Sequence, residues 1–103
     1  MKRGETEFCI MPESGLYFTK RLPGFERHEV FFGRNYRNKS IEDGLVVFLE
    51  PVRHRGFNGV HGSGEQGIAL NKRLKQIGQK AAMDYYGWTV EKFIERYGAN
   101  YLE

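Results

Sequence analysis

A histidine and a glutamate lie side by side in an otherwise apolar, strand-like stretch, "FERHEVFFG" at residues 25–33. Burying a polar group without a partner costs roughly 2–7 kcal/mol, and burying an unpaired charge costs more. His28 and Glu29 therefore either face solvent from an edge strand or meet a partner that satisfies them. A metal ion or a phosphate group would be such a partner.

The other two histidines of the chain follow a second apolar run, in "LEPVRHRGFNGVHG" at residues 49–62. Pro51 suits the first turn of a short helix, which we expect to begin there. His54 and Asn58 are four residues apart and would share one face of this helix. The glycines of the segment weaken the helix and leave a loop as the alternative. His61 would lie two turns beyond His54 if the helix continued.

Short strand candidates occupy the part of the chain before residue 62, which is rich in glycine, proline and aromatic residues. They are residues 16–20, 25–32 and 45–49, and glycine-containing turn signals separate them. The last candidate, "LVVFL", has the β-branched and aromatic residues that are typical of a buried strand.

The rest of the chain has a helical pattern. Apolar residues recur at spacings of three and four from Leu70 to Tyr85, which predicts an amphipathic helix that Gly87 ends. Gly78 interrupts this helix at a cost of about 1 kcal/mol relative to alanine, and would allow another backbone to approach closely. Thr89 is a good N-cap for a second helix. The tail at residues 100–102 is expected to dock, and strands followed by helices indicate an α+β fold.

The composition is that of one globular domain with a mild basic excess. The chain has 103 residues and a net charge of +3, which is compatible with binding to nucleic acid. No apolar run reaches the roughly 20 residues that cross a bilayer, and no signal-peptide pattern is visible, so we expect a cytoplasmic protein with no membrane partner. Cys9 is the one cysteine, which excludes an internal disulfide and a cysteine-rich zinc site.

Several segments follow one another in a recognisable order. They are "HEVFFG" at residues 28–33, "NKSIEDGLVVFL" at 38–49, "P-x-x-H" at 51–54, "GVH" at 59–61 and the helical ending at 70–102. Together they resemble the small HNH endonuclease-related proteins that are common in phages and prophages. The resemblance covers about residues 25–102.

This resemblance implies a ββα-metal (HNH-like) core, in which two short antiparallel strands and a helix hold one divalent ion. The implied single domain, 1–103, has an N-terminal hairpin or loop at 1–24, the ββα-metal motif at 25–62 and a two-helix tail at 63–103. The expected ion is Mg²⁺ or Mn²⁺, with Zn²⁺ as the alternative. The expected function is that of a metal-dependent DNA endonuclease, which hydrolyses phosphodiester bonds.

The resemblance also suggests roles for individual residues. His28 is the candidate general base, because an imidazole has a pKa near working pH, and either His28 or Glu29 is a candidate metal ligand. Many relatives carry two adjacent histidines here, the first as ligand and the second as base. That register makes His28 the ligand and Glu29 the catalytic base, and both assignments stay open. His54 matches the catalytic, metal-binding histidine of the helix, and Asn58 and His61 are further ligand candidates.

Basic residues flank the expected site and are candidates for contacts with DNA phosphates. They are Arg34, Arg37, Lys39, Arg53 and Arg55.

The chain departs from the family pattern at two places. Many relatives carry a zinc knuckle of four cysteines, of which Cys9 alone remains, so no structural zinc is expected. The middle asparagine of the motif is represented only by Asp43-Gly44. These departures support a second hypothesis, a catalytically inactive phage protein derived from an HNH nuclease. Such a protein would bind nucleic acid or inhibit a host protein. A dimer formed through the helical tail is a third, weaker interpretation, and the oligomeric state stays open.

Overall fold

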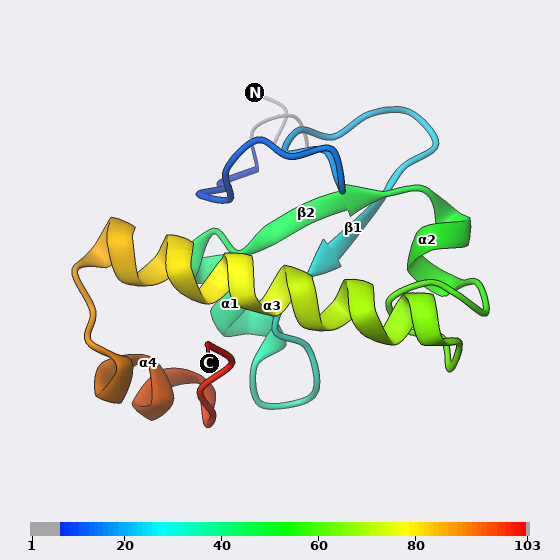
Figure 1. Cartoon of the computed structure of the whole chain (residues 1–103). Helices are drawn as coiled ribbons and strands as arrows, with labels where there is room; N and C mark the ends of the chain where they lie inside the picture. Colours follow the sequence, from blue (N-terminus) through cyan, green and yellow to red (C-terminus); the bar gives the residue numbers. More distant parts are fainter. Residues whose placement is uncertain (1–6, 103) are drawn as a thin grey trace.

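In the computed structural model, which describes residues 7–102, two short strands form an antiparallel sheet and a long helix crosses it (Figure 1). The strands are β1 (Glu26–Glu29) and β2 (Val46–Leu49). The helices are α1 (Arg37–Asp43), α2 (Pro51–Arg55), α3 (Glu65–Tyr86) and α4 (Val90–Tyr97). The expected α+β class is confirmed.

β2 is buried along its whole length and has neighbours on both edges. β1 pairs with one edge. On the other edge Phe18 exchanges two backbone hydrogen bonds with Phe48, of 2.8 and 3.0 Å. The predicted strand at residues 16–20 is reduced to this bridge, because a tight turn closed by the Ser14–Tyr17 bridge directly precedes it.

The sequence patterns do not predict α1, which depends on contacts with the end of the first strand. The buried hydroxyl of Ser40 accepts a hydrogen bond from the Phe31 N–H (3.0 Å) and donates one to the Phe31 carbonyl (2.7 Å). Because Ser40 takes up these backbone groups, the strand predicted at residues 25–32 stops at Glu29. Gly44 ends α1 in the left-handed conformation, with φ of 81°.

α3 supplies the other wall of the core. It begins at Glu65, before the first residue of the predicted apolar stripe, and Gly87 ends it with φ of 71°. A Cβ added at Gly78 would lie 3.2 Å from both the Phe31 ring and the Val30 side chain, so side chains, and not the expected second backbone, pack close to this glycine. α3 has 22 residues, yet no helix of residues 7–102 is long and apolar enough to cross a membrane.

The C-terminal segment docks on α3, as expected. The buried amide of Gln79 accepts a hydrogen bond from the Tyr101 N–H (2.7 Å) and donates one to Asn100 Oδ1 (2.8 Å). The Tyr101 ring lies 5.5 Å from the ring of Phe31, centroid to centroid. The tail therefore covers the core around Phe31.

Asp43 ties α1 to α4. Its nearly buried carboxylate accepts a hydrogen bond from the Tyr97 hydroxyl (2.6 Å) and two from the Arg96 guanidinium (2.8 and 2.9 Å). Burial and the neighbouring Asp43 carboxylate both raise the pKa of Tyr97, so its hydroxyl remains a donor. The residue at the expected asparagine position of the motif thus makes interhelical contacts.

We predict that Asp43→Ala lowers the free energy of unfolding by about 2–3 kcal/mol, because it removes the acceptor of a largely buried charged network. Glu42→Ala is the matched control, since Glu42 also pairs with Arg96 but is exposed, and we expect a loss of less than about 1 kcal/mol. Urea unfolding followed by circular dichroism measures both. Equal losses in the two variants would contradict this role of Asp43.

Candidate metal centre

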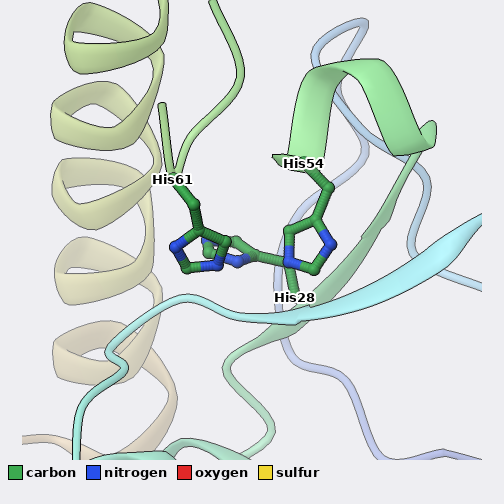
Figure 2. Close-up of side chains that lie close together, drawn as sticks. All are labelled: His28, His54 and His61. Atoms are coloured by element: carbon green, nitrogen blue, oxygen red, sulfur yellow. The ribbon is translucent and has the colours of Figure 1, made fainter. Parts of the chain in front are cut away.

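The three histidines converge, although they lie far apart in the sequence (Figure 2). His28 comes from β1, His54 from α2, and His61 from the loop that leads to α3. One possible ligand atom of each residue lies within 4.8 Å of the others. Nitrogen ligands of one zinc ion lie about 2.0–2.1 Å from it, so the three ligand atoms would have to move somewhat closer together to share a single ion.

A turn after α2 brings His61 back to His54. α2 begins at Pro51, as predicted, but ends at Arg55, so the helix does not extend to His61. Instead the His61 N–H donates a hydrogen bond to the His54 carbonyl (3.1 Å). A Cβ at Gly59 would lie 2.6 Å from the Arg53 carbonyl oxygen, which explains why the turn needs glycine there. The glycines that weaken the helix therefore build the loop that places the third imidazole.

His28 is the buried member of the group. Its side chain is 1% exposed, and neither ring nitrogen has a hydrogen-bond partner within residues 7–102. An unsatisfied buried polar group costs about 1–3 kcal/mol. Burial, with smaller effects of His61 and His54, lowers the pKa of His28 to about 3, so the ring is neutral at neutral pH. Neutral imidazole is the form that coordinates a metal ion, and coordination would satisfy one of the unpaired nitrogens.

His54 is oriented by Glu26. The distance from His54 Nδ1 to Glu26 Oε1 is 2.8 Å, and Glu26 also accepts two hydrogen bonds from Arg55 (3.0 and 2.6 Å). Hydrogen bonds from His54 and Arg55 lower the pKa of Glu26, which keeps it a carboxylate. Nε2 is then the coordinating atom of His54, and Figure 2 shows one ring nitrogen pointing toward the other imidazoles. A carboxylate behind a metal-binding histidine is a common feature of metal sites.

Sequence reasoning missed Glu26, although a signal was present. Glu26 and His28 are two residues apart on a strand, so their side chains lie on the same face of the sheet. The register of β1 on β2 then brings Glu26 opposite Leu49, directly before the helix that carries His54. Strand alternation would therefore have suggested Glu26 as a partner of this histidine.

His61 forms the open side of the group, because it is exposed. Burial of part of the ring and the neighbouring His54 lower its pKa, as do the charges of Arg37 and Lys75, whereas Glu29 raises it. One carboxylate and two cations thus lie close enough to His61 to influence it. The open side of the cluster is flanked by both kinds of charge.

Two of the five predicted metal ligands have other neighbours. Glu29 accepts a hydrogen bond from Arg27 (3.0 Å) and lies 3.8 Å from the Arg37 Nε. The Asn58 side-chain oxygen lies against Gly64, where an added Cβ would be 1.9 Å from it. α2 ends before Asn58, so His54 and Asn58 do not share a helix face. Coordination by Glu29 or Asn58 stays a prediction.

The predicted DNA-contacting residues are distributed around the domain. Arg55 is held by Glu26, and Arg37 lies near Glu29. Arg53 is exposed, and Lys39 donates to the carbonyl of Arg96 on α4 (3.1 Å). Arg34 is exposed. Two members of this set therefore contact a carboxylate near the histidines: Arg37 contacts Glu29, and Arg55 contacts Glu26.

Three imidazoles with one open side are a donor set suited to Zn²⁺ or another first-row transition ion. Mg²⁺ prefers carboxylate and water oxygens, so the group suits it less well. No family model, curated protein or solved structure matches this chain. The geometry of the three histidines is accordingly the main evidence for a site.

We predict that Glu26→Gln weakens Zn²⁺ binding by about tenfold to a hundredfold, because the amide no longer holds His54 as a carboxylate does. Competition with a chromophoric chelator measures the dissociation constant. Glu50→Gln is the matched control at the start of the same helix, and its affinity should stay within about threefold of the unmodified protein, since Glu50 is exposed and makes no capping hydrogen bond through its side chain. Equal affinities for Glu26→Gln and the unmodified protein would contradict the orienting role.

Proposed function

We propose that this domain is a metal-dependent DNA endonuclease of the HNH type, which hydrolyses phosphodiester bonds. The observation that carries the proposal is the convergence of His28, His54 and His61, with both nitrogens of the buried His28 unpartnered among residues 7–102. These residues are the ones that the HNH resemblance singles out.

The order of the elements supports the same proposal. His28 is carried by the first of two antiparallel strands, and His54 by the short helix that directly follows the second. This order corresponds to the ββα-metal arrangement that the resemblance implies, with α1 inserted between the strands. The helical tail then packs on this unit through α3.

In this proposal His28 is a metal ligand and Glu29 is the general base. The His28 ring is 1% exposed, so it is shielded from a water molecule on the open side, and its low pKa makes it a poor proton acceptor. Glu29 is the next residue, so its side chain leaves β1 on the other face from His28, but at the end of the strand its charge still reaches His61 and raises the pKa of that imidazole. Arg27 and Arg37 position its carboxylate. Glu29 would accept the proton of the attacking water.

The ion, when bound by the three histidines, would stabilise the charge that develops on the phosphate and on the leaving oxygen. Arg37 would contact the phosphate from the side of Glu29. Arg55 would act indirectly, because its guanidinium holds Glu26 and thereby the orientation of His54.

A second candidate function is a protein that binds DNA without cutting it. The observation that favours it is that the two carboxylate oxygens of Glu29 face guanidinium groups, Arg27 at 3.0 Å and Arg37 at 3.8 Å, and not the three histidines. The residue at the motif's asparagine position, Asp43, is also engaged elsewhere, by Arg96 and Tyr97. This candidate keeps the metal centre and the basic residues but omits proton transfer.

Nicking of supercoiled plasmid DNA in Zn²⁺, Mn²⁺, Mg²⁺ or EDTA tests the proposal. We expect nicking in at least one transition ion and none in EDTA. Glu29→Gln should slow nicking by about a hundredfold or more, as loss of a general base does, while metal affinity is retained. His54→Ala should lose both metal binding and nicking.

Equal nicking by His54→Ala and the unmodified protein would contradict a nuclease built on this centre. Metal-dependent DNA binding without any nicking would favour the second candidate function. The two variants are purified identically, so a contaminating nuclease would appear in both.

A further inference from the structure

Lys75 brings a positive charge from α3 to the edge of the histidine cluster. Its ammonium lies 4.7 Å from the centroid of the Phe32 ring and 5.2 Å from that of Tyr101. The Phe32 ring in turn lies 4.6 Å from the ring of His61 and 5.6 Å from that of His28, centroid to centroid. One aromatic ring therefore separates the ammonium from two of the proposed metal ligands.

The charge of Lys75 is not neutralised within the described chain. Other lysines of the helices face carboxylates, as Lys80 does with Asp84 at 3.5 Å and Lys92 with Glu95 at 3.5 Å. No carboxylate of residues 7–102 forms an ion pair with Lys75, and its half-buried position lowers its pKa. Its charge also disfavours protonation of both His28 and His61. A cation that is poorly hydrated and lacks a counter-ion is a good partner for an anion.

A second unsatisfied group lies on the same face of α3. Asn71 is one turn before Lys75, and its side-chain oxygen is buried without a hydrogen-bond partner in the part of the chain described. α3 runs beside His61 (Figure 2). Within residues 7–102, this face of α3 thus holds Lys75, which forms no ion pair, and Asn71, whose side-chain oxygen has no hydrogen-bond partner.

We propose that Lys75 binds the phosphate group that occupies the open side of the three-histidine centre. The inference rests on the proposed function and adds to it a residue of the helical tail, outside the segment that resembles the ββα-metal motif. A divalent ion held by three neutral imidazoles keeps its full charge, and Arg37 and Lys75 add to it. A phosphodiester is an anion that matches this combination of charges and donors.

Cobalt spectroscopy tests this role without reference to cleavage. The Co²⁺-loaded protein is titrated with inorganic phosphate, and the visible bands of the ion report phosphate at the open side. We expect Lys75→Met to need about tenfold to a hundredfold more phosphate, which corresponds to the loss of one charged hydrogen bond. Methionine keeps the packing of the stem on Phe32 and Tyr101, and Lys75→Arg should restore most of the affinity.

Lys80→Met is the matched control, since it removes the same charge from another face of the same helix. Its phosphate titration should match that of the unmodified protein.

Lys75→Met should bind Co²⁺ at least as tightly as the unmodified protein, because a nearby positive charge is removed. Its slope of log affinity for duplex DNA against log salt should fall by about 0.9, the value for one phosphate contact.

Phosphate titrations and salt slopes that are the same for Lys75→Met and the unmodified protein would overturn the inference. If the unmodified protein still nicks DNA in that case, the proposed function stands and only the role of Lys75 is lost. A phosphate response that depends on Lys75, in a protein that never nicks DNA, would keep this inference and remove the nuclease. A protein that takes up no Co²⁺ would overturn both.

Discussion

The buried imidazole of His28 is the constraint on which the interpretation of this domain depends. A neutral ring that finds no hydrogen bond in the described part of the chain is a poor choice for a core position, because an apolar side chain would fill the same space at no polar cost. Two further imidazoles, those of His54 and His61, lie around it. The Glu26 carboxylate orients the ring of His54. A shared cation accounts for all of these features together, since it needs neutral, unpaired nitrogens that converge from fixed directions.

The scaffold holds those directions through contacts that are remote from the histidines. β2 is buried between β1 and Phe18, which fixes the strand that carries His28. The glycine-rich turn after α2 fastens His61 to His54 through the backbone. The helical tail is more than a support, because α3 carries Lys75 to the cluster and the docked Tyr101 packs against its ammonium. The proposed centre would therefore use residues from both parts of the chain.

Much of this arrangement could be predicted from the sequence, and the failures have physical causes. The apolar stripe, Thr89 and the glycine caps predict α3 and α4 because these signals are local. α1 has no such signal, since Ser40 forms its decisive hydrogen bonds with a residue nine positions away.

The sequence identifies the three histidines as candidate metal ligands, but their convergence depends on strand register and on a turn. The contact of Lys75 with Phe32 depends on how α3 crosses the sheet, which no spacing in the sequence reveals. The HNH assignment stays a prediction.

Anomalous scattering from a crystal grown with Zn²⁺ tests the central claim most directly. We predict one zinc ion per chain, with nitrogens of His28, His54 and His61 about 2.0–2.1 Å from it and a solvent molecule or anion in the remaining position. Crystals that show no anomalous peak between these rings at saturating Zn²⁺, or an ion that leaves His28 uncoordinated, would contradict the account.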